Sequence, residues 1–417
     1  MECHHPAMAL DPQTLTDNVK RFARSLGFDL VGITGPEPFE EDRARMLERL
    51  EAGLMDGYHW FTAERVRLAT DPRALLPEAR AVIALGVSYY SAARLPAGEP
   101  GRPRGRIARY AWGRDYHDVL KRKLFQIVDY LEQATGRRPR FRYFVDSGPL
   151  AERAVARRAG LGSPGKNTCL LTSKGSFVFL AELIVDCELV PDAPSQKQTC
   201  GRCTLCLQAC PTGALVAPGV LDNRRCISYH TIENRGAIPR ELRAQMGEWI
   251  FGCDICQDVC PYNARPTLTR LPEFEPASPE RALPELIPLL ELDDAAFRER
   301  FRGSPVLRAK RWGLQRNVCV ALGNSGDPAA VPPLIRALEQ HDHPLVRGHA
   351  AWALGRLATS PAVPAESRHQ AIAALQRCLA VEQDESVREE VLAALETCGE
   401  LGQEAVPLTG PPASTIR

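Results

Sequence analysis

The organisation of this chain is decided by residues 200–211, which read CGRCTLCLQACP. Cys200, Cys203, Cys206 and Cys210 are followed by a proline, which is the spacing of the bacterial ferredoxin run. In that run three thiolates bind one cluster and the fourth binds the other cluster of a two-cluster protein. A structural zinc site needs only four ligands in two pairs and does not predict this run. The segment therefore indicates two [4Fe–4S] clusters.

A second run lies further along the chain and is incomplete. Cys253, Cys256 and Cys260 have the spacing of its last three cysteines, and Pro261 follows. Ile250 stands where the first cysteine of a complete run is expected. The partner run that a two-cluster protein needs is therefore present, but it supplies one ligand too few.

Crossed sharing between the two runs assigns seven of the ligands. The first cluster then has Cys200, Cys203, Cys206 and Cys260. The second cluster has Cys210, Cys253 and Cys256, and it lacks one ligand. Cys226 lies between the runs and is the nearest candidate, whereas Cys169 and Cys187 lie outside this segment.

Composition excludes several other classes of protein. The 417 residues carry 52 Lys plus Arg against 51 Asp plus Glu, a net charge of +1, so a uniformly basic coat or an acidic tail is excluded. The N-terminal MECHHPAM lacks the features of a secretory signal, and no apolar run reaches the ~20 residues of a membrane helix. We therefore expect a cytoplasmic protein whose fourteen cysteines are reduced.

The first 195 residues alternate between two periodicities. Apolar residues at helical spacing predict helices over 12–26, 116–135 and 151–159. Short β-rich segments predict strands over 30–33, 81–90, 142–145 and 177–185. This alternation indicates an α/β or α+β domain over 1–195, and the polar, Pro-containing segment 191–198 predicts its boundary.

The C-terminal part shows a different, repeated pattern. Leu322, Leu354 and Leu395 stand in similar settings, 32 and 41 residues apart, which fits HEAT-type helical pairs with an insertion. We therefore predict an α+β multidomain protein: an α/β domain over 1–195, a ferredoxin-like two-cluster domain over 196–270, an all-α HEAT-like repeat domain over 285–405 and a flexible tail over 406–417.

Several longer segments resemble one known family, in the same order along the chain. They are DPRALLPEARAVIALGVSYY (71–90), RIARYAWGRDYHDVLKRKL (106–124), FVDSGPLAERAVARRAGLG (144–162), GKNT (165–168), SYHTIENRGAIP (228–239) and FGCDICQDVCPYN (251–263). Together with the two cysteine runs and the repeats, they make the chain resemble the epoxyqueuosine reductases over nearly its whole length.

The resemblance implies a function and its cofactors. The family reduces epoxyqueuosine to queuosine at the wobble position of tRNA, the last step of queuosine synthesis, with cobalamin and electrons passed through two [4Fe–4S] clusters. It implies that the corrinoid lies in the N-terminal domain and that the anticodon stem-loop is the partner. We also expect a monomer, with an electron donor that the sequence does not identify.

The resemblance also assigns site residues. Asp146 corresponds to the family's proton donor, and a carboxylic acid can protonate the epoxide oxygen as its C–O bond breaks. The alternative for Asp146 is a helix N-cap, because it precedes the helix expected over 151–159. The implied contacts of the cofactor are Arg67, Arg109, Tyr110, Asp146, Gly165, Lys166, Asn167 and Ser228.

Two features bear on how the cofactor and the tRNA are held. The segment 115–120 has Leu120 where a motif that supplies histidine to cobalt has glycine, which is consistent with cobalt carrying no protein histidine. Seven Lys or Arg lie within 297–316, with Phe301 and Trp312 between them. We expect these cations to bind phosphates and the rings to stack on bases. The alternative is a solvated helix face whose aromatic rings belong to the core.

Two other functions stay open from the sequence. A reductive dehalogenase shares the cobalamin and two-cluster arrangement, but that class normally carries an export signal and has no need of a helical repeat domain. An iron–sulfur electron-transfer or scaffold protein would use its clusters and repeats for a partner. Binding of cobalamin distinguishes this last alternative from the two enzymes.

Overall fold

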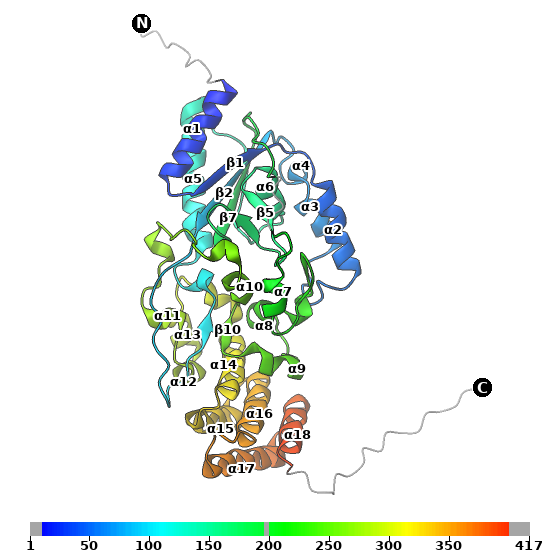
Figure 1. The fold of residues 1–417 in the computed structure, drawn as a ribbon, viewed down its shortest axis with the longest axis vertical. Coiled ribbons are helices and arrows are strands. Elements are labelled where there is room, and N and C mark those ends of the chain that lie inside the picture. Colours follow the sequence, from blue (N-terminus) through cyan, green and yellow to red (C-terminus); the bar gives the residue numbers. More distant parts are fainter. Residues whose placement is uncertain (1–10, 196–199, 400–417) are drawn as a thin grey trace, which may run out of the picture. The chain divides into compact units, whose positions relative to one another are not determined.

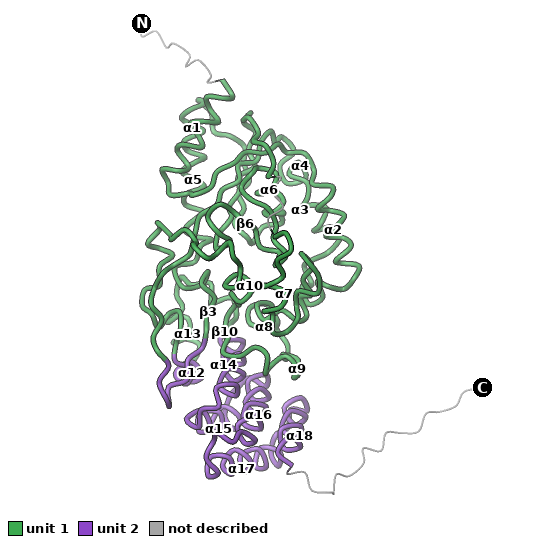
Figure 2. Tube along the Cα trace, in the orientation of Figure 1, with its two compact units in different colours: residues 1–97, 106–284, 293–310 green, residues 98–105, 285–292, 311–417 purple. Residues whose placement is uncertain are grey.

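A computed structural model describes residues 11–195 and 200–399. The tail expected over 406–417 lies outside the described residues, as does Cys3. The chain forms two compact units, which Figure 2 colours separately. Of the described residues, the sheet unit takes 11–97, 106–195, 200–284 and 293–310, and the helical unit takes 98–105, 285–292 and 311–399.

The sheet unit begins with helices and strands in alternation (Figure 1). Its helices up to residue 158 are α1 (Pro12–Ser25), α2 (Glu40–Glu51), α3 (Ala63–Ala69), α4 (Pro72–Leu75), α5 (Tyr116–Thr135) and α6 (Glu152–Arg158). Its strands up to residue 185 are β1 (Leu30–Thr34), β2 (Ala81–Ser88), β3 (Arg106–Ile107), β4 (Phe141–Phe144), β5 (Gly162–Pro164), β6 (Leu170–Thr172) and β7 (Val178–Val185). The helix expected over 116–135 has these bounds, and the other expected elements differ by a few residues.

Four of these strands form one sheet in the order β1-β2-β7-β4. Every neighbouring pair is antiparallel, with Ala84 of β2 opposite Glu182 of β7 and Phe144 of β4 opposite the same glutamate. Because no pair in this sheet is parallel, the domain expected over 1–195 is of the α+β kind rather than the parallel α/β kind. All eight residues of β2 are buried, as expected of a central strand.

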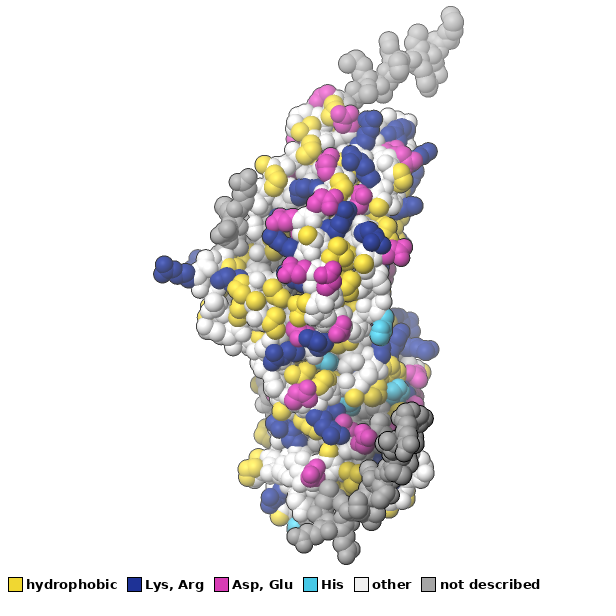
Figure 3. All heavy atoms as spheres, turned by 90° about the vertical axis from the view of Figure 1, so that its right-hand side faces the viewer, with side chains coloured by type: hydrophobic (Ala, Val, Ile, Leu, Met, Phe, Trp, Pro, Cys, Tyr) yellow, Lys and Arg dark blue, Asp and Glu magenta, His cyan; other side chains and the backbone are white. Residues whose placement is uncertain are grey.

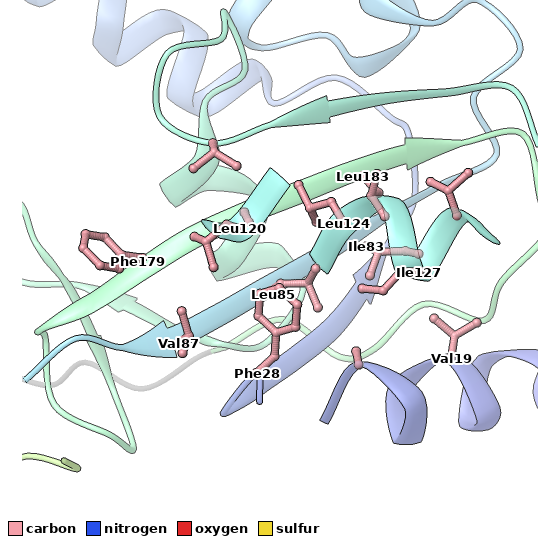
Figure 4. Packing of buried hydrophobic residues seen from close by; sticks show 14 of the residues in the cluster. Val19, Phe28, Ile83, Leu85, Val87, Leu120, Leu124, Ile127, Phe179 and Leu183 are labelled. Atoms are coloured by element: carbon pink, nitrogen blue, oxygen red, sulfur yellow. The ribbon is translucent and has the colours of Figure 1, made fainter. Parts of the chain in front are cut away.

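Helices cover both faces of the sheet. On one face α1 and α5 pack on the odd-numbered residues of β2 and β7, and Figure 4 shows Leu120 and Leu124 of α5 against Ile83 and Leu183. On the other face α6 packs on the even-numbered residues, among them Val82 and Ile184. The period of two along a strand assigns each side chain to one of these faces.

The segment that carries the cysteines belongs to the same compact unit. Its elements are α7 (Leu205–Ala209), β8 (Leu215–Ala217), β9 (Val220–Leu221), α8 (Ile227–Ile232), α9 (Arg240–Arg243), β10 (Trp249–Phe251) and α10 (Ile255–Asp258). β10 pairs in parallel with β3, and the Ala108 amide donates to the carbonyl of Phe251 at 2.8 Å. These contacts make one unit of the two domains expected over 1–195 and 196–270.

The helical unit stacks its helices in two rows. The first row is α14 (Arg311–Ser325), α16 (Pro344–Ala358) and α18 (Glu385–Thr397), and the second is α15 (Val331–Gln340) and α17 (Ala365–Val381). Glycines allow the first row to approach closely: a Cβ on Gly323 would lie 2.9 Å from the Ala353 Cα, and one on Gly355 would lie 2.8 Å from the Ala394 Cβ. The expected equivalent leucines are buried in this row.

The surface charges and the hydropathy of the helices agree with what the composition indicates. On the face in Figure 3, basic and acidic side chains are intermixed, as the near-zero net charge suggests. In the described ranges, no helix is both long and apolar enough to cross a membrane.

Candidate active site and cysteine centre

Asp146 lies in the loop between β4 and α6 and has a left-handed backbone, with a φ of 57°. Its side chain is two-thirds exposed, at 66%. The Tyr116 hydroxyl donates to its Oδ2 at 2.7 Å, and the His117 Nε2 lies 3.8 Å from the same oxygen. The Asp146 carboxyl is therefore held at the surface by groups from the first turn of α5.

The local chain explains why Asp146 adopts this conformation. A Cβ on Gly148 would lie 2.1 Å from the Phe144 ring, so the loop turns tightly over the end of β4. The Gly148 carbonyl accepts from the Arg65 guanidinium at 2.7 Å. The N-cap of α6 is Ala151, without a side-chain cap, so the alternative that Asp146 caps this helix is wrong.

His117 completes a row of polar groups that the sequence analysis did not identify. Its Nδ1 lies 2.7 Å from Oδ1 of Asp115, the N-cap of α5. Its Nε2 is buried and has no hydrogen-bond partner among the described residues. Burial and the neighbouring Asp146 raise the pKa of Tyr116, which stays protonated and donates its hydrogen bond. Only the contact between α5 and the loop after β4 brings these groups together.

Tyr110 lies beside this site. Its ring contacts Tyr116 edge-on, with centroids 6.1 Å apart, and packs on Phe251 at 5.8 Å. Burial and the charge of Asp146 raise the pKa of Tyr110. Tyr110 and Asp146, two of the expected site residues, are therefore neighbours, and Phe251 connects them to the cysteine segment.

The eight thiols form two sets of electrostatic neighbours. Cys206 interacts with Cys200 and Cys260, and Cys260 interacts with Cys200 and Cys203. This set has the four members that crossed sharing assigns to the first cluster.

The second set contains Cys226. Cys253 interacts with Cys226 and Cys210, and Cys256 interacts with Cys253 and Cys226. Cys169 is also a neighbour, because its thiol hydrogen-bonds with that of Cys256. The neighbours of Cys226 include Cys210 of the expected second set, and Cys169 lies near both sets, because it is also a neighbour of Cys260.

Backbone amides donate to six of these sulfurs. The Lys166 amide lies 3.4 Å from the Cys200 Sγ, and the Ala214 amide lies 3.3 Å from the Cys210 Sγ. Other amides donate to Cys206, Cys226, Cys253 and Cys260. Such donors stabilise thiolates and tune the potential of iron–sulfur clusters, so the donor set fits two clusters.

A site for a single metal ion needs several ligand side chains that converge on one point, which an iron–sulfur cluster does not. In the described ranges, no three His, Cys, Asp or Glu side chains are placed to hold one metal ion. In a [4Fe–4S] cluster each of the four thiolates binds a different iron atom, so two sets of four thiols need no such convergence.

The GKNT loop holds both cysteine runs. The Lys166 ammonium donates to the carbonyls of Gly201 and Cys203, at 2.8 and 2.9 Å. The Asn167 amide donates to the carbonyl of Cys256 at 3.1 Å. A Cβ on Gly165 would lie 2.7 Å from the Asn167 Oδ1, so only glycine fits there without a shift. The contacts of Lys166 and Asn167 are thus with the cysteine loops, where polar groups of a cofactor were expected.

The remaining expected cofactor contacts occupy different positions. The Arg109 guanidinium lies 3.2 Å from an oxygen of Asp258 and 3.6 Å from one of Asp254. Ser228 is half-buried at the start of α8, and its amide donates to the Cys226 sulfur. Arg67 is exposed in the last turn of α3.

The basic stretch 297–316 differs from the expectation. Phe301 is only 3% exposed, so the interpretation that its ring stacks on bases is wrong, because the core covers it. Arg316 is buried against Asn317, and Arg311 pairs with Asp342 at 2.5 Å. Trp312 stacks on the His343 ring, with centroids 4.5 Å apart.

Three family models match parts of the chain. Residues 70–147 match the model described as "Epoxyqueuosine reductase QueG". Residues 199–263 match a "4Fe-4S double cluster binding domain", and residues 305–402 match "HEAT repeats". The predictions of a two-cluster segment and of HEAT-like repeats are therefore confirmed.

Whole proteins match over most of their length. The epoxyqueuosine reductase of Bacillus subtilis (strain 168) is 37% identical over 386 residues, which cover 92% of this chain and 95% of that protein. A crystal structure of epoxyqueuosine reductase with a tRNA-Tyr epoxyqueuosine-modified stem loop has a TM-score of 0.85 and 36% identity, covering 93% of this chain and 99% of that one.

A third match is a structure whose description names a catalytic aspartate loop. A structure of the Bacillus subtilis epoxyqueuosine reductase, with its catalytic aspartate loop swung out of the active site, has a TM-score of 0.84 and 35% identity and covers 92% of this chain and 99% of that one. By identity, coverage and the matching family models, this chain belongs to the epoxyqueuosine reductase family.

Proposed function

We propose that this chain reduces epoxyqueuosine to queuosine at the wobble position of tRNA. The observation that carries the proposal is its likeness, over 93% of its length, to an epoxyqueuosine reductase solved with an epoxyqueuosine-modified tRNA stem loop. The reaction removes the epoxide oxygen as water and forms a double bond, so it consumes two electrons and two protons. The chain must therefore deliver electrons and at least one positioned proton.

The two sets of thiols are proposed as the route of the electrons. Cys200, Cys203, Cys206 and Cys260 hold one [4Fe–4S] cluster, and Cys210, Cys226, Cys253 and Cys256 hold the other. The amides that donate to their sulfurs support this assignment. Lys166 and Asn167 keep the two loops together, since each donates to a carbonyl of one run.

Cobalamin is the second proposed cofactor. When bound, it supplies a low-valent cobalt centre that transfers electrons to the epoxide. The buried, unpartnered Nε2 of His117, at the edge of the Asp146 site, is a polar atom that a ligand can satisfy, which supports a ligand on this side. The residues proposed to contact the corrinoid are Arg67, Arg109, Tyr110, Asp146, Gly165, Lys166, Asn167 and Ser228.

Asp146 is proposed as the acid that protonates the epoxide oxygen. Tyr116 fixes one carboxyl oxygen by its hydrogen bond, which orients the other oxygen for the substrate. The His117 ring lies beside this acid, with Nδ1 2.7 Å from Asp115 and Nε2 3.8 Å from Asp146. The tRNA anticodon stem-loop is the proposed substrate, and the electron donor is a separate reductant.

The experiment is an anaerobic single-turnover assay. The protein is reconstituted with iron, sulfide and cobalamin and given reductant and epoxyqueuosine-containing tRNA, and the modified nucleoside is measured by mass spectrometry. We expect the loss of one oxygen atom, dependent on cobalamin. Asp146→Asn should lower the rate by about 10²–10⁴-fold, the usual contribution of a general acid. Asp129→Asn, on the exposed side of α5, is the matched control.

Contrary results would point to the other functions. No oxygen loss, despite bound clusters and corrinoid, would favour a reductive dehalogenase-like enzyme. Failure to bind corrinoid with the clusters intact would favour an electron-transfer or scaffold protein. An Asp146→Asn variant as active as the control would exclude Asp146 as the acid.

A further inference from the structure

Two carboxyl groups lie behind the Asp146 loop, and one of them is fully buried. Glu182 is on β7 and is completely buried, at 0% exposure. Its even position puts it on the face of the sheet that α6 covers, and Glu152 is the first residue of α6. The proposed function makes no use of either glutamate.

Glu152 contacts the loop directly. Its Oε1 accepts a hydrogen bond from the backbone amide of Asp146 at 2.5 Å. Asp146 is one of three described non-glycine residues with a positive φ, a conformation that must be held by its surroundings. The Glu152 carboxyl therefore holds the backbone at the residue that carries the acid.

The partner of Glu152 on the sheet is Glu182. The two carboxyl groups are close enough for a hydrogen bond between them to affect the pKa of each. Both oxygens of Glu182 are buried, and neither has another hydrogen-bond partner among the described residues. Because an ionised carboxylate only accepts hydrogen bonds, the bond between two carboxyl groups requires one of them to carry a proton.

We propose that Glu152 and Glu182 share one buried proton, and that this shared proton keeps Glu152 in place as the acceptor for the Asp146 amide. The pair positions the acid and does not touch the substrate. This inference rests on the proposed role of Asp146.

Charges around the pair favour the protonated state. Burial and the Asp146 charge raise the pKa of Glu152 to about 8, while Arg153 opposes this shift. Burial and the charge of Glu152 raise the pKa of Glu182, and Asp146 adds to the shift. Tyr116 is the other titratable neighbour of Glu152, and it is neutral. At neutral pH the pair therefore retains its proton, and at higher pH the loss of that proton puts two negative charges side by side.

The experiment uses the resting full-length protein without substrate, so its result is independent of turnover. Infrared difference spectra should show the carbonyl stretch of a protonated carboxyl at pH 7, and Glu182→Gln should remove it, because the new amide can donate to an ionised Glu152. Hydrogen exchange of peptides that span residues 145–151 should be about tenfold faster in Glu152→Ala, the effect of losing one hydrogen bond. Glu152→Gln should restore protection, because its amide oxygen still accepts from Asp146.

The pH dependence separates a positioning role from a merely structural one. After correction for intrinsic rates, exchange of this loop in the wild type should speed up above about pH 8, and Glu182→Gln should abolish that change. Glu132→Gln, at a partly exposed position on α5 where the carboxylate pairs with Arg138, is the control and should behave as the wild type.

Either of two results would overturn the proposal: a wild-type spectrum with no protonated carboxyl band, or unchanged loop exchange in Glu152→Ala. A protein that shows the band and the exchange pattern but does not reduce epoxyqueuosine would contradict the proposed function and leave the carboxyl pair standing.

Discussion

The cysteine segment and the Asp146 site differ in how their chemistry is distributed along the chain. The eight clustered cysteines fall within 200–260, and most of them belong to two short runs. The Asp146 site takes groups from α5, the loop after β4, α6 and β7, which no local spacing connects. A cluster demands ligands that wrap around it, so its motif is local, whereas an acid needs only neighbours in space.

The largest expected effect concerns Cys226, the one proposed cluster ligand outside the runs. Cys226→Ala should remove the second cluster and retain the first, so that bound iron falls from about eight to about four atoms per chain. Oxygen removal from epoxyqueuosine should stop, because electron transfer through the second cluster is lost. Iron analysis and electron paramagnetic resonance of the purified variant measure this.

Cys169→Ala is the matched control, because its thiol also lies beside Cys256 but is outside the proposed set. It should keep both clusters. If Cys226→Ala kept its full iron content and Cys169→Ala lost iron, Cys169 would be the ligand of the second cluster and Cys226 would not.

The next prediction tests whether the reaction rate depends on the conformation of the loop that carries Asp146. In Gly148→Ala the added Cβ meets the Phe144 ring, which lies in the core and is not free to move away. The loop should shift, and the reaction rate should fall by about 10²-fold, as expected for a displacement of about 1 Å at a reacting group. Single-turnover rates and cluster content are measured together.

Gly201→Ala is the control in the cysteine segment, where a Cβ meets nothing within 4 Å. With its φ of 47°, it should cost about 1–2 kcal/mol of folding free energy and leave the chemical step unchanged. If both variants lost the same fraction of the rate, the reaction would be no more sensitive to a change in the Asp146 loop than to one in the cysteine segment.

A smaller effect is expected from the hydrogen bond to Asp146, the proposed acid. Tyr116→Phe removes the 2.7 Å bond to Asp146 and keeps the stacking of the ring on Phe179. The rate should fall about tenfold, because a hydrogen bond to a charged group contributes about 1.5 kcal/mol or more. Tyr143→Phe, at an exposed ring on β4, should have no effect on single turnover. A Tyr116→Phe rate equal to that of this control would remove Tyr116 from the proposed site.

The last expected effect is on stability, with no change in rate, and it depends on pH. The folded-state pKa of Glu182 is raised above its ordinary value of 4.5, chiefly by burial. Between pH 4.5 and the folded pKa, only the unfolded chain releases the proton, so the wild type loses up to about 1.4 kcal/mol of stability per pH unit. Glu182→Gln escapes this loss. In urea unfolding, the free energy of unfolding of Glu182→Gln should equal that of the wild type near pH 4 and exceed it by a growing amount toward pH 8. A difference that is the same at every pH would contradict the raised pKa.

Much of the fold follows from local sequence. The helix expected over 116–135 is α5, because its apolar spacing and the glycine at residue 136 mark the whole element. The repeats were predictable from the leucines of the first helical row, since each repeat buries the same face. The interpretation of Phe301 as a ring for stacking on bases was wrong, because basic neighbours in sequence do not show that the core covers the ring.

The sequence by itself determined the two cysteine runs, the helical repeats and, through the family resemblance, the importance of Asp146. Only the tertiary structure decided that Cys226 joins the second set of thiols, that Lys166 holds the first cysteine run, and that Glu182 faces Glu152. The physical reason is distance along the chain. Spacing encodes contacts within one turn or one loop, whereas these contacts depend on strand register and on how α6 packs on the sheet.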